Sequence, residues 1–165
     1  MAVKKSRRGR VYEDFQVGDV YHHPLGRTIT QADNIWLTLL TLNTNPIHFD
    51  SAYAARTEWQ RPLVDSTLTL ALVTGLSVSD LSQNAINLGW DKVRLPHPVF
   101  DGDTLYAESE VLEIRESRSR PHMGIVRVRT RGLNQDGQPV IEFERTIMVY
   151  KRGHEVDTRP TAREE

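Results

Sequence analysis

The segment LVDSTLTLALVTGLSVSDL, residues 63–81, decides the fold of this 165-residue chain more than any other segment. Its leucines and valines recur around nearly the whole circumference of a helix, and such a helix must be covered on most sides. We therefore predict one buried helix over residues 63–81. A membrane span also needs about 20 apolar residues. Asp65, Asp80 and many serines and threonines argue against a span here.

Strand patterns surround this helix along the chain. Residues 11–15 and 18–29 are extended candidates before the first helix. Four later segments have the alternation typical of strands: residues 88–95, 104–115, 125–133 and 140–150. This order predicts an α+β fold in which a curved antiparallel sheet wraps around a long central helix. Its open strand edges favour formation of a dimer.

The final hairpin can be placed in register. Asp136-Gly137 is typical of a two-residue type I′ turn, which puts Gln135 opposite Gln138. Counting outward from that pair gives the partners of every residue in the two strands.

Charges along this hairpin support the register. Arg131 then faces Glu142 and Arg129 faces Glu144, and opposite charges across a strand pair are favourable. We interpret the stripe that also includes Arg127 as a salt-bridged surface. Phosphate binding by this stripe is the alternative.

The first helix is predicted from its start signal. Thr30-Gln31-Ala32-Asp33 resembles a capping box, with a hydroxyl and a carboxylate placed for free N–H groups. An apolar stripe at helical spacing follows and continues through Leu42: Ile35, Trp36, Leu39 and Leu40. Pro46 ends this element, and Asp50 starts a short helix over residues 51–56.

Composition limits the classes of function. The chain has no cysteine, which excludes disulfides, thiolate metal sites and cysteine nucleophiles, and its net charge of −1 gives no basic field for nucleic acid. Residues 1–10 are basic without an apolar stretch behind them, so we expect a flexible arm rather than a secretory signal. Residues 11–151 then form one domain and residues 152–165 a polar tail. We expect a cytoplasmic protein.

One stretch carries chemistry: Asn45-Pro46-Ile47-His48, followed by Asp50. It places an imidazole at a turn between apolar elements, and a histidine titrates near neutral pH. A hydrogen-bonded structural histidine is the alternative for His48 alone. The pair His22-His23 has no third ligand at a recognisable spacing, so we expect no metal site.

These residues resemble a known family. Asn45-Pro46-Ile47-His48 is similar to the hydratase motif of the MaoC-like dehydratases, the (R)-specific enoyl-CoA hydratase group with the hot-dog fold. Pro98-Val99-Phe100-Asp101-Gly102-Asp103-Thr104-Leu105 resembles a later motif of the same family. The resemblance covers roughly residues 11–151 and implies a hot-dog domain there.

The chain departs from the family pattern at the catalytic pair. The family motif usually reads Gly-Asp-x-Asn-Pro-x-His, whereas this chain has Leu42 and Asn43 at the first two positions. The usual His-Gly at the start of the central helix is Asp65-Ser66 here. This combination resembles the branch that acts on small branched dicarboxylyl-CoA thioesters such as mesaconyl-, itaconyl- or methylmalyl-CoA.

The resemblance implies reversible addition of water to a short, branched dicarboxylic 2-enoyl-CoA. His48 would be the acid/base. Asn43 would position the water, or only hydrogen-bond within the turn, because an amide cannot titrate. Asp65 would supply a second carboxylate, or cap its own helix, or both.

Substrate binding is assigned to four further residues. The N–H of Ser66 would stabilise the thioester oxyanion, and Asn45 would hold the turn. Arg61 and Arg94 are candidate cations for the acyl carboxylate or the CoA phosphates.

The expected partners follow from this function. They are an acyl-CoA thioester substrate and a second copy, as a homodimer or a dimer of dimers, with no nucleic acid and no membrane. No cofactor is expected, since coenzyme A is part of the substrate. A hot-dog acyl-CoA thioesterase and a non-catalytic acyl-CoA-binding subunit are the competing functions.

Overall fold

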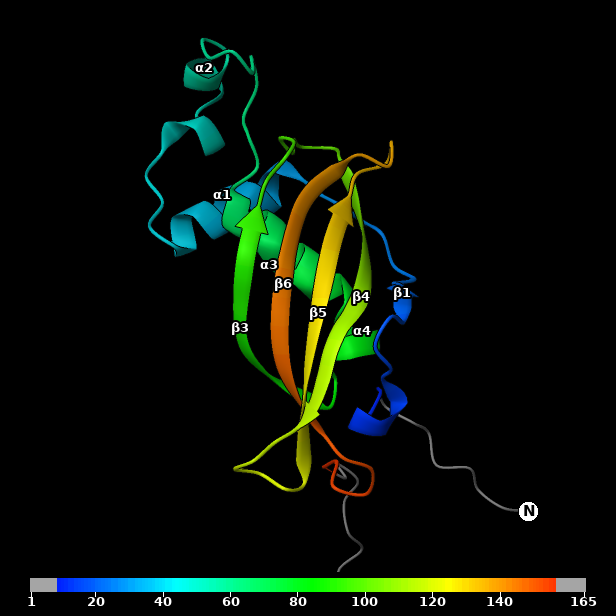
Figure 1. Ribbon diagram of the computed structural model, residues 1–165. Helices are drawn as coiled ribbons and strands as arrows, with labels where there is room; N and C mark the ends of the chain where they lie inside the picture. The colour runs from blue at the N-terminus through cyan, green and yellow to red at the C-terminus, as the bar shows by residue number, and fades with distance from the viewer. Residues whose placement is uncertain (1–8, 157–165) are drawn as a thin grey trace, which may run out of the picture.

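One antiparallel sheet with helices on one of its faces makes up the computed structural model, which describes residues 9–156 (Figure 1). The elements follow in the order η1 (Tyr12–Asp14), β1 (Val20–His22), β2 (Arg27–Thr28), α1 (Gln31–Leu40), η2 (Pro46–His48), α2 (Ser51–Ala54), α3 (Ser66–Leu76), α4 (Val78–Leu81), β3 (Ala85–Arg94), β4 (Thr104–Glu116), β5 (Met123–Leu133) and β6 (Pro139–Tyr150). The sheet order is β1-β4-β5-β6-β3, and β2 also pairs with β4. The sheet curves across α3, so the predicted α+β arrangement is confirmed.

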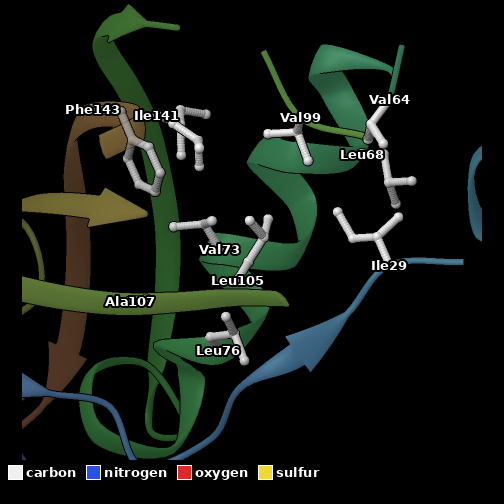
Figure 2. Close-up of a cluster of buried hydrophobic side chains, with 11 residues drawn as sticks. Ile29, Val64, Leu68, Val73, Leu76, Val99, Leu105, Ala107, Ile141 and Phe143 are labelled. Carbon is white, nitrogen blue, oxygen red and sulfur yellow. The ribbon is translucent and has the colours of Figure 1, made fainter. Parts of the chain in front are cut away.

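The principal core lies between α3 and the inner face of the sheet (Figure 2). Leu68 and Val73 of α3 meet Leu105 of β4 and Phe143 of β6, and all four are buried. Gly132 of β5 allows this close approach, because a Cβ there would lie 2.6 Å from a methyl carbon of Val73. Burial of each large apolar side chain contributes about 1.5–3 kcal/mol, so this contact holds the helix to the sheet.

The prediction of one continuous helix over residues 63–81 is wrong. Leu63 instead forms an isolated β-bridge with Phe100, and α3 begins only after Asp65, whose carboxylate accepts the N–H of Thr67 at 2.7 Å. Ser77, whose hydroxyl donates to the Thr74 carbonyl, separates α3 from α4. Polar side chains that hydrogen-bond to the backbone thus define both ends of α3. The periodicity of apolar residues does not reveal these ends.

The expected extended segment at residues 11–15 is also wrong. It is the 3-10 helix η1, in which the Asp14 carboxylate accepts the N–H of Val11 at 3.0 Å. Val11 and Phe15 are buried on either side of it. The segment 18–29 contains only the short strands β1 and β2, while β3 begins three residues before the expected residue 88.

The α1 helix has the predicted start, and most of its apolar stripe is exposed. Asp33 N–H donates to the Thr30 hydroxyl, and the Asp33 carboxylate accepts the Thr30 N–H, which completes the capping box. The buried residues of α1 are Asn34 and Thr38, whereas Trp36 is 69% exposed. The apolar stripe therefore faces away from this chain's own core.

The register of the last hairpin is confirmed, although its turn is not the predicted one. Arg131 pairs with Glu142 as expected. The loop has three residues rather than two, because the N–H of Asn134 donates to the carbonyl of Gln138 and Gly137 adopts φ 75°. A β-bulge after Gly132 shifts the pairing by one residue and so compensates for the longer loop. Three-residue loops in hairpins are typically accompanied by such a bulge.

The arginine stripe on the outer face of β5 is salt-bridged, as predicted. Arg129 Nη1 lies 3.1 Å from a carboxylate oxygen of Glu110 on β4. Arg127 is paired with Glu144 and Arg131 binds Glu108 on β4. These guanidinium groups are thus neutralised within the sheet.

A buried polar network ties the N-terminal segment and α4 to the sheet. His23 lies 2.9 Å from Asp80 through Nδ1 and 2.9 Å from the Ser109 hydroxyl through Nε2. The Ser109 hydroxyl continues the network to Thr130 at 2.8 Å. The His23 side chain has no exposed surface, so its charge state matters to folding.

The two termini lie mostly outside the described part. Of the predicted arm at residues 1–10 only Gly9 and Arg10 are described, and Arg10 pairs with Asp80 at 3.1 Å. Of the predicted tail at residues 152–165 the last nine residues lie outside, while Arg152 pairs with Asp14 at 2.8 Å. Within residues 9–156, every helix is too short or too polar to cross a bilayer.

Acidification should destabilise the protein through His23. Burial lowers its pKa below the ordinary 6.5, and Asp80, which acts in the opposite direction, offsets only part of this effect. The unfolded chain therefore binds the proton first, so this contribution to stability is present above pH 6.5 and is lost as the pH falls below it. Urea unfolding of His23→Gln should show a weaker loss of stability between pH 7 and 5.5 than the unmodified protein.

His22→Gln is the matched control, because the neighbouring His22 side chain is 79% exposed. It should keep the original pH dependence. Equal slopes for His23→Gln and the unmodified protein would contradict the assignment.

Candidate active site

The His48 imidazole is held in one orientation at the end of η2. Its Nδ1 lies 2.9 Å from the carbonyl oxygen of Leu63. A carbonyl only accepts, so Nδ1 carries the hydrogen and Nε2 of the neutral ring keeps its lone pair. No residue among 9–156 hydrogen-bonds to Nε2. The ring is half-buried and can accept a proton from a bound water or substrate.

The turn that carries His48 is built by local polar contacts. Asn45 Oδ1 accepts the N–H of Ile47 at 3.3 Å, and Pro46 occupies the first position of η2. Asp50 caps α2 by accepting the N–H of Tyr53 at 2.9 Å. These contacts confirm the predicted structural roles of Asn45 and Asp50.

Asn34 organises the site, and the sequence reasoning missed it. This α1 residue is 3% exposed, and its Nδ2 donates to the carbonyls of His48 at 2.8 Å and Leu63 at 2.9 Å. Its Oδ1 accepts the N–H of Asp65 at 2.8 Å. One amide thus joins α1, η2 and the segment that leads into α3.

Asp65 caps α3 and also faces the His48 turn. One carboxylate oxygen accepts the N–H of Thr67 at 2.7 Å and its hydroxyl at 2.6 Å. The other oxygen accepts Nδ2 of Asn43 at 2.7 Å. The N-cap interpretation is confirmed, and the carboxylate remains available to its neighbours in the site.

Asp65 is a carboxylate rather than a carboxylic acid at neutral pH. Burial raises the pKa of Asp65. The hydrogen bonds from Thr67 and Asn43 and the charge interaction with His48 lower it by more, so the net pKa is below the ordinary value. It therefore has no proton to donate near pH 7. It can orient its neighbours and stabilise positive charge.

Asn43 is fixed on both sides of its amide. Besides the bond to Asp65, its Oδ1 accepts the N–H of Asn45 at 3.1 Å. The second N–H of the amide and one lone pair of Oδ1 are left for a water or substrate. Asn43 therefore hydrogen-bonds within the turn and can also position a water, so its contacts are compatible with both roles considered for it.

Leu42 is the strained residue of this turn. It has φ 58° and is 84% exposed. The N–H of Leu42 donates to Leu39 and that of Asn43 to Thr38, which is the Schellman motif at the end of α1. The left-handed position usually needs glycine, and leucine there costs about 1–2 kcal/mol.

The remaining predicted binding residues are placed differently. Ser66 is the first residue of α3, and its N–H donates to no group within residues 9–156. Arg61 is exposed and lies over the ring of Phe100, 3.6 Å from its centroid. Arg94, at the end of β3, is paired in register with Glu142 and forms no described bond to the His48 turn.

Other polar features lie apart from the group of Asn34, Asn43, His48 and Asp65, which we call the His48 group. A hollow of about 420 Å³ is lined by Lys92, Arg115 and Arg127 on the outer face of the sheet. Lys92 and Arg127 both bind Glu144 there, so their charges are already paired. No three metal-binding side chains converge anywhere in residues 9–156. The chemistry is therefore assigned to the His48 group.

Comparison with known proteins identifies relatives of the chain. A family model described as mesaconyl-CoA hydratase matches residues 2–164. A mesaconyl-CoA hydratase of Cereibacter sphaeroides is 37% identical over 149 residues, which are 90% of this chain and 43% of that protein. The chain therefore spans about two fifths of this relative.

Solved structures agree with the fold. The structure of a MaoC domain protein dehydratase from Chloroflexus aurantiacus has a TM-score of 0.85 and 33% identity, covering 97% of this chain and 46% of that one. A Mycobacterium tuberculosis protein described as a double hot-dog fold has a TM-score of 0.80 and 23% identity, covering 93% and 47%. The hot-dog fold expected from the sequence is confirmed.

Removal of the Asn34 amide should damage both stability and site geometry. Asn34→Ala removes the partner of the buried Asp65 N–H and of the His48 carbonyl, and one of the two donors to the Leu63 carbonyl. We therefore expect a loss of about 2–3 kcal/mol in the free energy of unfolding. Urea denaturation measures this loss. Thr41→Ala is the control, because the Thr41 hydroxyl bonds only to its own helix and the side chain is exposed. A loss for Asn34→Ala no larger than that of the control would contradict the role of the amide.

Proposed function

The chain belongs to the mesaconyl-CoA hydratase family, and from this premise we propose that it catalyses the reversible hydration of a short 2-enoyl-CoA, with a branched dicarboxylic acyl group as substrate. The observation that carries the proposal is the His48 imidazole, whose Nδ1 donates to the Leu63 carbonyl and whose Nε2 has no partner among residues 9–156. Asp65, which holds Asn43, is near enough for its charge to interact with that of His48. The Cereibacter sphaeroides relative is more than twice as long as the matched region, so the activity is proposed for this chain rather than transferred to it.

His48 begins the reaction as a general base. Nε2 takes a proton from a water that the free amide N–H or the carbonyl of Asn43 orients. The water oxygen forms a bond to the β-carbon, and the π electrons of the alkene move toward the thioester oxygen. General base catalysis of this kind contributes roughly 10²–10⁴-fold to the rate.

The start of α3 would stabilise the enolate that results. The N–H of Ser66 is one of the unbonded donors at the positive end of the helix. One well-placed oxyanion donor is worth roughly 10²–10³-fold in kcat. Asp65 leaves this donor free, since its own carboxylate takes the next N–H, that of Thr67.

The second step returns the proton. The imidazolium of His48 donates it to the α-carbon, the enolate electrons form the new C–H bond, and the histidine is neutral again. Asp65 is ionised and cannot be this acid, so one histidine serves both steps. The nearby carboxylate favours the transient imidazolium through its opposite charge.

The rest of the partner assignment follows from this chemistry. Every proton in the scheme is moved by His48, so we propose that no cofactor is needed beyond the coenzyme A of the substrate. We further propose that the protein acts in the cytoplasm and on neither nucleic acid nor membranes, consistent with a net charge of −1.

A panel of acyl-CoA thioesters tests the proposal directly. Mass spectrometry should detect gain of one water by an unsaturated dicarboxylyl-CoA and its loss from the hydroxyacyl product. Release of free CoA without a hydroxyacyl-CoA would establish the thioesterase alternative. Tight binding without turnover, unaffected by His48→Ala, would establish a non-catalytic subunit.

Two variants test the contributions of His48 and Asp65 to catalysis separately. His48→Gln should lower kcat by roughly 100-fold or more, because the base is lost. Asp65→Asn should lower kcat by roughly tenfold or more, since removal of a charge-assisted hydrogen-bond acceptor costs about 1.5–3 kcal/mol. Steady-state hydration kinetics measure both changes.

Asp50→Asn is the matched control for Asp65→Asn. Both residues cap a helix with a carboxylate, but Asp50 caps α2 and its carboxylate forms no described hydrogen bond with the His48 group. It should keep near-full activity. Full activity in Asp65→Asn would remove Asp65 from the mechanism.

We also propose that the working unit is a dimer or a dimer of dimers. Trp36 and Leu40 of α1 and Leu88 of β3 are 69%, 75% and 49% exposed. β3 is an edge strand whose outer side is unpaired within the described sheet (Figure 1). A second copy would supply the hot-dog unit that the longer double hot-dog structure contains, and would cover this apolar face.

Charged substitutions on this face test the assembly. Leu40→Glu and Leu88→Glu should each weaken association by roughly 100-fold, because a carboxylate would be buried without a partner. Sedimentation velocity over a range of concentrations measures the change. Leu25→Glu, at a leucine 63% exposed beside β2, is the control and should leave the dimer intact. A monomer before any substitution would overturn the proposal.

A further inference from the structure

We propose that Arg61, laid over the ring of Phe100, binds the free carboxylate of the dicarboxylyl thioester and thereby selects the acyl group. This inference rests on the proposed hydratase function and adds a specificity-determining residue to it.

The position of Arg61 is set by the same segment that orients the base. The Leu63 carbonyl accepts Nδ1 of His48, and Leu63 is bridged to Phe100. Arg61 precedes Leu63 by two residues, which is about 6–7 Å along an extended segment. Its guanidinium carbon is 3.6 Å from the Phe100 ring centroid. Arg61 and the carbonyl that orients the imidazole therefore lie on one short segment, and both that segment and the Arg61 guanidinium contact Phe100.

Phe100 positions the Arg61 guanidinium and leaves its hydrogen-bond donors free. Stacking on an aromatic face leaves the N–H groups at the edge of the plane, where a planar carboxylate can bind two of them. Trp59 packs beside Phe100, with ring centroids 6.2 Å apart, and supports the ring. Arg61 is thus a pre-oriented fork. A lysine has no planar fork and cannot reproduce this geometry.

Arg61 is one of the arginines in residues 9–156 whose charge is unpaired. Most arginines of the described residues have a carboxylate partner within 4.0 Å, and Arg61 has none. The others without such a partner are Arg56, Arg94, Arg118, Arg120 and Arg145. An unpaired cation held over an aromatic ring, on the segment that orients His48, matches the free carboxylate of this substrate class.

The remaining unpaired arginines are placed less suitably. Arg118 and Arg120 lie in the β4–β5 connection, at the end of the sheet opposite α2 (Figure 1). Arg145 is 1% exposed on β6, and its burial lowers its pKa to about 10. Arg56 and Arg94 have no described ring contact and do not lie on the segment that bonds to His48.

The test compares two substrates that differ in the carboxylate. Values of kcat/KM are measured for mesaconyl-CoA and for crotonyl-CoA, which lacks the second carboxylate. In Arg61→Met the ratio of the two values should fall roughly 10- to 100-fold, as expected when a charge-assisted hydrogen bond is lost. The crotonyl-CoA value should stay within about twofold. Arg61→Lys should give an intermediate ratio.

Arg56→Met is the matched control, since Arg56 is another exposed, unpaired arginine before α3. It should leave the ratio unchanged. Phe100→Leu keeps the charge but removes the platform, and it should lower the ratio in the same direction. An unchanged ratio in Arg61→Met would overturn the proposal.

A third arm separates the carboxylate from the CoA phosphates. The same measurements are repeated with pantetheine thioesters, which carry the acyl group without the nucleotide. If Arg61→Met lowers both CoA substrates equally and the loss disappears with pantetheine thioesters, Arg61 binds phosphate and the proposal is wrong. If the unmodified protein hydrates neither acyl-CoA, the hydratase function itself fails, a result distinct from an unchanged ratio.

Discussion

The structure of the site depends on one buried amide. Asn34 accepts the N–H of Asp65 and donates to the carbonyls of His48 and Leu63, so it joins three segments that are distant in sequence. Buried backbone groups must be paired. Because a single side chain meets that requirement for all three segments, the position of the imidazole, the start of α3 and the orientation of α1 are linked.

Asp65 shows how one residue serves both fold and chemistry. It begins α3 by capping the N–H of Thr67, and the same contact keeps the carboxylate ionised. Its second oxygen holds Asn43, which stands where the family motif usually has an aspartate. The carboxylate at the start of α3 therefore lies next to the histidine turn.

Several elements were predictable because local signals decide them. The capping box at Thr30, the N-cap at Asp50 and the pairing of Arg131 with Glu142 all follow from neighbouring side chains. The three-residue loop escaped prediction because a bulge after Gly132 compensates for the extra residue and leaves the register of Arg129 and Arg131 unchanged. Their ion pairs are nevertheless formed with Glu110 and Glu108 of β4 rather than across the hairpin. The outward face of α1 escaped it too, since an apolar stripe is normally assigned to a chain's own core. Asn34 was missed for the same reason.

The sequence by itself determined the family and the hot-dog fold through its resemblance to known motifs, and it determined local elements through capping and strand alternation, because these signals are encoded in neighbouring residues. Only the tertiary structure decided which residues touch. Asn43 and Asp65 are 22 residues apart in sequence, yet their side chains form a 2.7 Å hydrogen bond. Arg61, unlike Arg94, stacks on the ring of Phe100, a contact that no local sequence pattern predicts. Contacts of this kind form only when the chain folds the sheet around the helix, because their geometry depends on how the elements that carry these residues pack together.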